Sequence, residues 1–264
     1  METKLLEKPI AIGRTAEVYP WESGKVLKVF REWFPIEAAK SECRVATQVF
    51  EAGLPVPAVG ELLQINGRTG LVYQRIDGDS LLDLIGKQPL RLFTAPFLLA
   101  KLHAQVHQCS ITDLPNRKQS IGQRIELSKL LTPEKKKRLL QNLEKLPDGT
   151  SLCHGDFHPG NILMTISGPI VIDWMDASSG DPLSDVARTL VLAEGNSPKN
   201  AGNIPSVLAK VLKLFGQVYL WRYCKLTGAK KEDVLRWIPV TAAARLNEGV
   251  VEAQERLLEL ARSV

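Results

Sequence analysis

Residues 9–76 carry short apolar runs broken by turn residues, a pattern that predicts a β-rich region containing one helix. The expected strands are 10–12, 18–19, 25–30, 59–65 and 71–76. The last two flank Asn66-Gly67, a pair typical of a two-residue hairpin turn. Between the third and fourth strands, residues 37–51 change to helical periodicity, and Gly53 followed by Pro55 ends the helix. Five strands and one helix are therefore expected to form a small lobe.

The pattern changes at residues 77–80, Asp-Gly-Asp-Ser, after which apolar positions recur with helical spacing. The expected helices are 91–109, 121–130, 133–146, 182–193, 204–226, 231–246 and 249–263. One hairpin interrupts them, with strands at 161–165 and 169–173 that turn at Ser167-Gly168. We therefore expect a hinge near residues 74–80, between an N-terminal β-rich domain, 1–76, and a C-terminal helical domain, 77–264.

The composition of the 264-residue chain is ordinary, with 44% hydrophobic and 24% charged residues and a formal net charge of +5. The positive charge is too diffuse to predict a nucleic-acid partner. The four cysteines are Cys43, Cys109, Cys153 and Cys224. None forms a C-x-x-C pair, so neither a zinc knuckle nor a disulfide framework is indicated. Residues 1–8 have no apolar signal core and no window is long enough to span a membrane, so we expect a cytoplasmic protein without membrane insertion. Its oligomeric state is unknown at this point.

The motif that carries chemistry is His154–Asn161, with the sequence HGDFHPGN, followed twelve positions later by Asp173. The order H-x-D-x-x-x-x-N, then an acid at a strand end, is how kinase-type phosphoryl transfer arranges its base and its metal ligands. Two carboxylates and a carboxamide gathered in one site repel each other unless a cation lies between them, and Mg²⁺ prefers such oxygen ligands. A simple tight turn rich in Asp, Gly and Pro is the alternative for the octapeptide alone. The spacing to Asp173 disfavours it.

Residues 10–189 resemble the aminoglycoside phosphotransferase and choline kinase family. His154–Leu163 matches the catalytic loop of that family almost letter for letter, and Ile172-Asp173-Trp174 with Gly180–Asp185 matches its metal-binding segment and the following helix start. Gly155 stands where protein kinases place arginine, which favours the small-molecule branch. The resemblance implies an α+β, two-lobed protein-kinase-like fold, with a small antiparallel β lobe that holds one helix and a larger, mainly helical lobe. It also implies an ATP- and Mg²⁺-dependent phosphotransferase whose acceptor is a hydroxyl of a small molecule, such as an antibiotic, an amino-alcohol or a sugar-like metabolite.

By this resemblance, Asp156 is the catalytic base and Asn161 and Asp173 ligate Mg²⁺. Lys28 lies between Leu27 and Val29 in a strand and needs an anion. The resemblance assigns it to the ATP phosphates, with Glu42 holding its ammonium group. Glu37, on the same helix, is the alternative partner. An edge-strand lysine that reaches solvent is the plain structural alternative.

The other nucleotide contacts that the resemblance implies are Gly13 and Thr15 at the phosphates, Val18 and Val26 above the adenine, Leu163 and Ile172 below it, and the backbone of Gln74 and Ile76 at its edge. A plain core role is equally compatible with each of the four apolar residues around the adenine. Trp174 and Asp176 follow the metal ligand and are candidate acceptor contacts. Their alternatives are a core tryptophan and a solvated turn aspartate.

Three residues are expected to be structural: Asp181 as a helix N-cap, Asp185 as a brace for the catalytic loop, and His154 as a hydrogen-bonding residue within that loop. His103 and His107 form H-x-x-x-H on one helix, a spacing that suggests zinc. Ala104 stands where a zinc protease needs its glutamate, and no acidic third ligand is evident in the sequence. We therefore expect one packed and one partly exposed histidine.

Three other functions stay open. A protein kinase is disfavoured by Gly155 and by the short path from Asp173 to Asp185. A non-catalytic nucleotide-binding module is disfavoured because every residue of the motif is retained. A metal-dependent hydrolase would use His154, Asp156 and His158 and bind a transition metal without nucleotide. Among acceptors, the excess of basic residues after Gly195 leans against a polycation, and acids local to the site can reverse that lean.

Overall fold

The computed structural model describes residues 8–195 and 206–262 and divides the chain into two compact units. Unit 1 consists of the residues up to Leu81 together with Asn161–Met175. Unit 2 consists of Leu82–Gly160 and the residues from Asp176 onward. The division at residues 74–80 that the sequence suggested stays a prediction, and the two units are described separately below.

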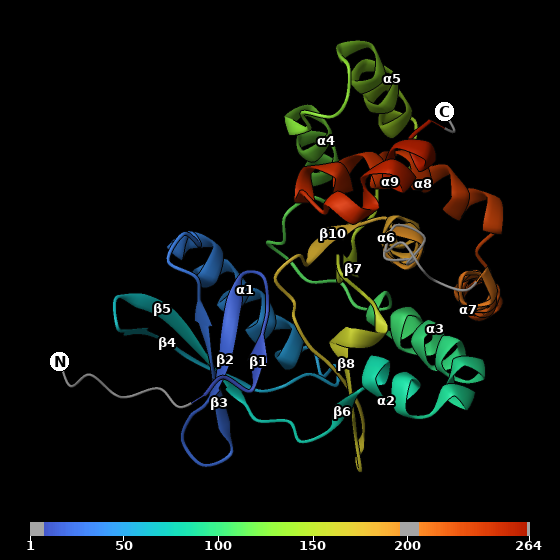
Figure 1. Ribbon diagram of the computed structural model, residues 1–264. Helices are drawn as coiled ribbons and strands as arrows, with labels where there is room; N and C mark the ends of the chain where they lie inside the picture. The colour runs from blue at the N-terminus through green and yellow to red at the C-terminus, as the bar shows by residue number, and fades with distance from the viewer. Residues whose placement is uncertain (1–7, 196–205, 263–264) are drawn as a thin grey trace. The chain divides into compact units, whose positions relative to one another are not determined.

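Unit 1 contains a five-stranded antiparallel sheet with the order β1-β2-β3-β5-β4 (Figure 1). Its strands are β1 (Ala11–Ile12), β2 (Ala16–Pro20), β3 (Lys25–Phe30), β4 (Val59–Ile65) and β5 (Arg68–Gln74). Asn66 and Gly67 both have positive φ, 49° and 76°, as a tight turn with two left-handed residues requires. The hairpin predicted from this pair is therefore present.

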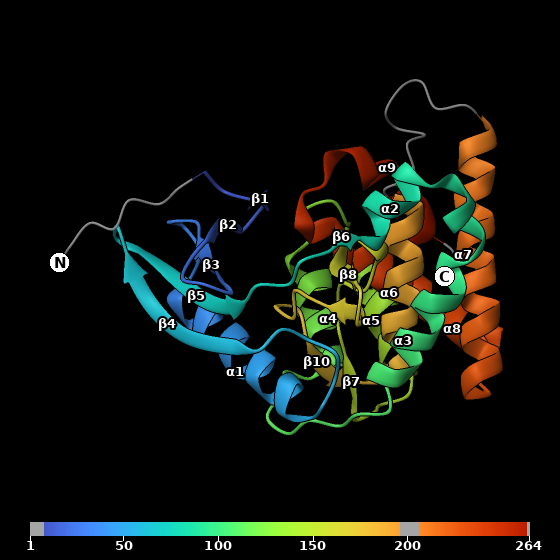
Figure 2. The same ribbon diagram turned by 90° about the horizontal axis from the view of Figure 1, so that it is seen from below.

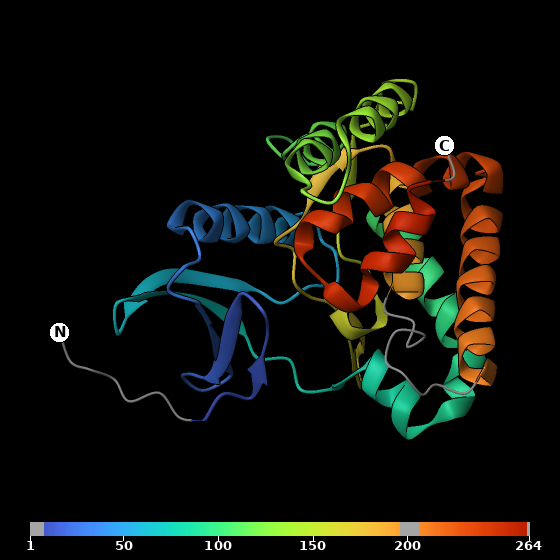
Figure 3. The ribbon, with the colours of Figure 1, turned by 45° about the horizontal axis from the view of Figure 1, so that its top comes forward.

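The two faces of this sheet are covered differently, because successive side chains of a strand point to opposite faces. One face packs Tyr19, Leu27, Val29, Ile65 and Val72 into a core cluster. On the other face, helix α1 (Ile36–Glu51) contributes Ala39 to a cluster with Phe30 and Leu71. Figure 3 shows α1 lying along that face of the sheet. The helix ends before Gly53, which has a φ of 77°.

The second sheet of unit 1 has the order β6-β8-β9, formed by Asp79–Ser80, Ile162–Thr165 and Gly168–Val171. A methyl group on Gly78 would meet the main chain of Met164, so a residue without a side chain is needed at this crossing. The β8–β9 hairpin brings its two ends together, and the Ile172 N–H donates to the Asn161 carbonyl over 3.0 Å. Residues 161 and 173 therefore lie at the same edge of unit 1.

Unit 2 is mainly helical. Its helices are α2 (Leu81–Lys87), α3 (Ala95–Val106), α4 (Arg117–Leu127), α5 (Pro133–Glu144), α6 (Pro182–Gly195), α7 (Ser206–Thr227), α8 (Lys231–Arg245) and α9 (Gln254–Leu260). Short 3₁₀ turns are η1 (Pro89–Phe93), η2 (Pro159–Asn161, at the boundary of the units), η4 (Leu246–Glu248) and η5 (Val251–Ala253). Helix α3 packs on α7, and α6 packs on α8 (Figure 2). Residues 154–160 of the HGDFHPGN motif belong to this unit.

Several helix boundaries differ from the expected ones. The segment 91–109 begins as the 3₁₀ turn η1 and becomes α3 only at Ala95, and 249–263 divides into η5 and α9. The expected ends Ile204 and Ser263 lie outside the described residues. The antiparallel pair β7 (Ser151–Cys153) with β10 (Ser178–Gly180) was not predicted, because three-residue strands are too short to show a period. Across the described parts of the chain, no helix combines the length and apolar character needed to cross a bilayer.

Candidate functional site

A lysine and two acids meet in unit 1. The ammonium group of Lys28 on β3 donates to Glu42 Oε1 over 2.7 Å and to Asp173 Oδ1 over 3.0 Å. Glu42 comes from α1, and Asp173 follows β9. The expected Lys28–Glu42 pair is therefore formed. The alternative partner, Glu37, pairs instead with Lys40 on the exposed side of α1, over 2.8 Å.

The charged groups of this cluster shift one another's pKa values. Burial disfavours the Lys28 ammonium, but the carboxylates of Asp173 and Glu42 outweigh that penalty and raise the pKa of Lys28. Burial, together with the charge of Asp173, raises the pKa of Glu42 despite its bond to Lys28. The Tyr73 hydroxyl also donates to Glu42 Oε1, over 3.0 Å. Lys28 is thus held as a permanent cation by groups that leave it little freedom to move.

Asp173 is the most unusual member of the cluster. Its φ of 66° is left-handed, a region that non-glycine residues enter at a cost of about 1–3 kcal/mol. Its side chain is 40% exposed, whereas that of Glu42 is 1% exposed. Asn161 is buried, and its main chain is fixed by the Ile172 N–H. One carboxylate and one carboxamide at the same edge of unit 1 are hard oxygen donors, so the donor set fits Mg²⁺.

The four apolar residues expected around the adenine come from two regions of unit 1. Val18 pairs directly with Lys28 in the sheet, and Val26 lies two residues before it, so all three side chains are on one face. Leu163 on β8 and Ile172 after β9 are half-buried in the second sheet of unit 1. The adenine contacts of these four residues therefore stay predictions.

The residues expected at the phosphates and at the adenine edge lie in turns and at a strand end. The Gly13 N–H donates to the Ala16 carbonyl over 2.8 Å, which closes the β1–β2 turn. Thr15 is half-buried in the same turn. At the end of β5, the Gln74 N–H donates to Ala58 over 2.8 Å, and Ile76 follows as a half-buried residue. The roles of these four residues stay predictions.

Sequence reasoning missed an ion network that braces the β1–β2 turn. Glu17 accepts from Arg31 over 2.8 Å, from Arg68 over 2.9 Å and from the Tyr19 hydroxyl over 2.9 Å. Its hydrogen bonds with Arg68 and Tyr19 lower the pKa of Glu17. Arg31 also donates to the Gly13 carbonyl over 3.4 Å, which ties the turn to β3. Arg68 is 51 positions from Glu17, too far for any local pattern to reveal.

In unit 2, the carboxylate of Asp156 is half-buried between two basic groups. Arg188 Nη2 lies 3.6 Å from its Oδ1, and His158 Nε2 lies 3.5 Å from its Oδ2. Burial works to raise the pKa of Asp156, but the hydrogen bond with His158 and the charge of Arg188 outweigh it, and the pKa lies below its usual value. The Asp156 N–H donates to His154 Nδ1 over 3.2 Å. Asp156 is therefore an ionised, oriented hydrogen-bond acceptor.

The loop that carries Asp156 is held by hydrogen bonds to Asp185 on α6. The two oxygens of Asp185 accept consecutive main-chain N–H groups, from His154 over 2.5 Å and from Gly155 over 2.9 Å. Arg117 Nη2 lies 3.7 Å from the same carboxylate. Asp185 thus braces the loop, and Asp181 caps α6 by accepting from the Leu183 N–H over 2.7 Å.

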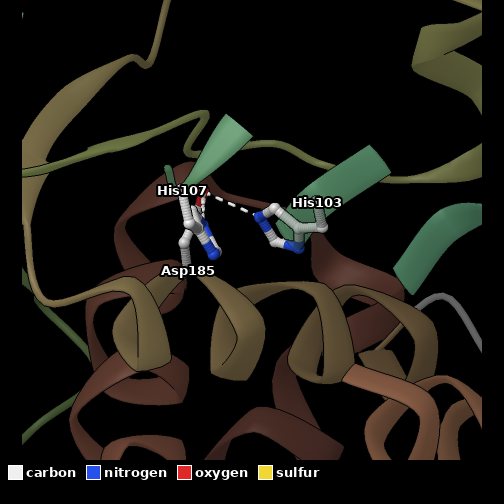
Figure 4. Close-up of side chains that lie close together, drawn as sticks. All are labelled: His103, His107 and Asp185. Carbon is white, nitrogen blue, oxygen red and sulfur yellow. Dashed lines mark hydrogen bonds and ion pairs between the residues drawn. The ribbon is translucent and has the colours of Figure 1, made fainter. Parts of the chain in front are cut away.

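Two histidines complete the surroundings of Asp185 (Figure 4). Nε2 of His103 lies 3.0 Å and Nε2 of His107 lies 3.5 Å from Asp185 Oδ2. Their Nδ1 atoms lie 2.6 Å and 2.7 Å from the hydroxyls of Tyr219 and Tyr223 on α7. The expectation that one of these histidines is partly exposed was wrong, because His103 is 0% and His107 only 8% exposed. The acid that the sequence did not reveal is Asp185, 78 positions from His107.

This cluster has the composition of a metal site but a closed set of hydrogen bonds. Ligand-type atoms of His103, His107 and Asp185 lie within 4.8 Å of one another. Both Nε2 atoms face Asp185 and both Nδ1 atoms face a tyrosine hydroxyl, so every ring nitrogen has a hydrogen-bonding partner. Burial and the neighbouring His107 lower the pKa of His103 to about 3, so its ring is neutral. The cluster is complete without a cation and serves to hold Asp185.

The two candidate acceptor contacts differ in their surroundings. Trp174 is 3% exposed and its indole N–H donates to Val171 over 3.3 Å, so it packs in the core of unit 1. Asp176 lies in unit 2, against Gly155. Gly155 has a φ of 83°, and a methyl group there would collide with the main chain of Asp176. Arg124 of α4, which sequence reasoning missed, donates to Asp176 Oδ1 over 2.6 Å.

Comparison with known proteins gives one family and one fold. The sequence model of the phosphotransferase enzyme family matches residues 8–219. An aminoglycoside phosphotransferase, APH(4)-Ia, solved with ADP and hygromycin B, is similar over 97% of this chain and 93% of its own, with a TM-score of 0.66 and 17% identity. A choline/ethanolamine kinase family protein from Mesorhizobium loti is similar over 98% and 87%, with a TM-score of 0.63 and 16% identity. An amicoumacin kinase solved with AMP-PNP, Ca²⁺ and amicoumacin is similar over 96% and 86%, with a TM-score of 0.63 and 15% identity.

No curated protein matches the sequence. The similarity to the solved structures confirms the expected α+β, protein-kinase-like fold, and at these identities it carries the fold alone.

Proposed function

We propose that this chain, which belongs to the phosphotransferase enzyme family, moves the γ-phosphoryl group of ATP to a hydroxyl of a small molecule. The activity is that of an ATP-dependent phosphotransferase with an alcohol group as acceptor, and Mg²⁺ would be its metal. The observation that carries the proposal is the Lys28–Glu42–Asp173 cluster, with bonds of 2.7 Å and 3.0 Å to the ammonium group. A lysine held by a helix acid beside a metal-binding aspartate is the arrangement that kinase-type phosphoryl transfer uses.

The donor side of the reaction is assigned to unit 1. Lys28 would bind the phosphates as a fixed cation, because the carboxylates around it keep it charged and in place. When bound, Mg²⁺ would neutralise phosphate charge, and Asn161 and Asp173 would hold it. Two of the similar structures were solved with ADP or AMP-PNP, which supports ATP as the donor.

The acceptor side is assigned to Asp156 in unit 2. Its ionised carboxylate would accept a hydrogen bond from the acceptor hydroxyl and take its proton as the hydroxyl oxygen bonds to the γ-phosphorus. The bond from that phosphorus to the bridging oxygen breaks, and ADP leaves. The lowered pKa of Asp156 makes it a weak base. Its main contribution is therefore to orient the hydroxyl, which matters more than base strength in a loose phosphoryl transition state.

The test is acceptor-stimulated ADP release in the presence of Mg²⁺, measured over a panel of hydroxyl compounds with Asp156→Asn as the blank. A positioned side chain that orients the acceptor hydroxyl and takes its proton contributes about 10²–10⁴-fold, so we expect the variant to lose about that factor in kcat and to keep its affinity for ATP. Full turnover by Asp156→Asn would contradict the assignment of the base. Failure of the unmodified protein to bind ATP with Mg²⁺ would contradict the proposed function itself.

A further inference from the structure

Glu248, which shares the guanidinium group of Arg188 with Asp156, is itself engaged by three arginines. Glu248, in η4, accepts from Arg188 over 2.6 Å, lies 3.4 Å from Arg124 and lies 3.5 Å from Arg245. Arg188 also lies 3.6 Å from Asp156 and donates to the Gly155 carbonyl over 3.1 Å. This acceptor-side network runs from Asp156 through Arg188, Glu248 and Arg124 to Asp176, and all its members belong to unit 2.

The acceptor-side network is electrically balanced. Its carboxylates are Asp156, Asp176 and Glu248, and its guanidinium groups are Arg124, Arg188 and Arg245. Burial works against the charge of Arg188, but Glu248 and Asp156 outweigh it and raise the pKa of Arg188. Burial and the charge of Arg188 together lower the pKa of Arg245, so positive charge is already crowded at the inner end of the network.

A polycationic acceptor fits such a network poorly. Each amine would need a carboxylate, and each carboxylate of the network already faces at least one guanidinium group at 2.6–3.6 Å. Arg188 and Arg245 are 5% and 3% exposed, so displacing either would leave a buried charge without its partner, which costs several kcal/mol. Crowded cations therefore act as a repulsive element against amines.

The outer end of the network offers a different kind of recognition. Arg124 and Asp176 are 36% and 25% exposed and joined by a bond of 2.6 Å. A carboxylate only accepts hydrogen bonds and a guanidinium only donates them, whereas a hydroxyl does both. A half-exposed pair of this kind therefore presents one acceptor beside one donor, which matches two neighbouring hydroxyl groups without requiring a charge on the ligand.

We propose that the phosphoryl acceptor is an uncharged polyhydroxylated compound, a sugar or similar polyol, and that Arg124 and Asp176 bind its hydroxyls as specificity-determining residues. The inference rests on the proposed function, since it concerns the acceptor of that same transfer. It selects one acceptor class and excludes the polycations bound by some members of the fold.

The experiment compares three classes of acceptor in the Mg²⁺-dependent ADP-release assay. The neutral probes are D-ribose, D-glucose and myo-inositol, the polycations are kanamycin and neomycin, and the anion is D-glycerate. We expect stimulation by at least one neutral probe and none by the polycations. Stimulation by the polycations or the anion alone, or by no neutral probe, would overturn the inference.

Two variants near the C-terminal end of α4 then test the role of Arg124. Arg124→Gln removes a charged hydrogen-bond donor, so KM for the neutral acceptor should rise at least about tenfold, with kcat and KM for ATP changed less than about twofold. Lys129→Gln, an exposed charge just beyond the same helix, should leave all three constants unchanged. An unchanged acceptor KM in Arg124→Gln would overturn the role of that residue.

Binding of ATP with Mg²⁺, measured by calorimetry without acceptor, separates the two levels of the argument. If the nucleotide binds and Lys28→Met weakens it, while no neutral probe stimulates ADP release, the acceptor inference fails and the donor-side assignment stands. If the nucleotide does not bind, the proposed function fails first.

Discussion

Two clusters of ionisable groups, one in each unit, each contain a central aspartate and differ in how much of it they leave exposed. In unit 1, Asp173 meets Lys28 while 40% exposed and on a left-handed backbone. In unit 2, Asp185 is 0% exposed and surrounded by histidine and main-chain donors. The first cluster keeps a charged group accessible to a ligand, and the second uses its acid to fix the chain. Exposure and strain, rather than the presence of titratable residues, therefore distinguish a binding group from a brace.

The sharpest way to break this comparison is to remove the brace. Asp185→Ala leaves the N–H groups of His154 and Gly155 and two buried imidazoles without their acceptor, so the free energy of unfolding should fall by about 3–5 kcal/mol. Urea unfolding followed by tryptophan fluorescence measures it. The control is Asp233→Ala on α8, whose side chain is 49% exposed and which should change stability by less than about 0.5 kcal/mol. Equal losses in the two variants would contradict the bracing role.

A second test uses the pH dependence of stability. The pKa of His103 is about 3 in the folded protein and 6.5 ordinarily. Below pH 6.5 the unfolded chain therefore takes up a proton that the folded protein refuses, and stability is lost as the pH falls from 6.5 toward about 3. The slope is about 1.4 kcal/mol per pH unit, or about 2 kcal/mol between pH 6.5 and 5. Lys28 adds no slope in this range, since its raised pKa matters only above its usual value.

The variant that isolates this effect is His103→Gln. Its unfolding free energy should depend less steeply on pH than that of the unmodified protein, by about one proton between pH 5 and 6.5. Parallel pH profiles for the two proteins would show that His103 titrates normally in the fold.

The smallest change in stability is expected in the open cluster. Asp173→Asn keeps a residue that tolerates the left-handed backbone and loses one ion pair at a 40% exposed side chain, so the free energy of unfolding should change by less than about 1 kcal/mol. Calorimetry should show that the variant no longer binds nucleotide with Mg²⁺ at concentrations at which the unmodified protein does. A loss of stability as large as that of Asp185→Ala would make Asp173 a brace as well.

The sequence predicted the parts of the molecule that depend on neighbours along the chain. Asn66-Gly67 placed a hairpin because its backbone geometry favours those residues, and the helical period of residues 37–51 placed α1. The groups around Asp156 come from far away. Arg188 is 32 and Glu248 is 92 positions from Asp156, and neither position carries a signal in any periodic pattern.

The burial of His107 was missed for the same reason. It depends on Tyr223, 116 positions later, and on Asp185. Helical spacing showed that His103 and His107 share a face of α3, and it could not show which helix packs against that face.

The discontinuity of unit 1 has a consequence for how the protein is made. Synthesis proceeds from the N-terminus, and all five strands of the larger sheet precede residue 75, so this sheet and its Lys28–Glu42 pair can assemble while the rest of the chain is still being translated. Asp173 belongs to the same unit but emerges only after residues 82–160, which fold elsewhere. A nascent or truncated chain that ends before residue 173 would therefore have the cation and its first partner but lack the acid that completes them. Competence for nucleotide binding should therefore appear late in translation, when Asp173, just after the β8–β9 hairpin, reaches Lys28 on β3.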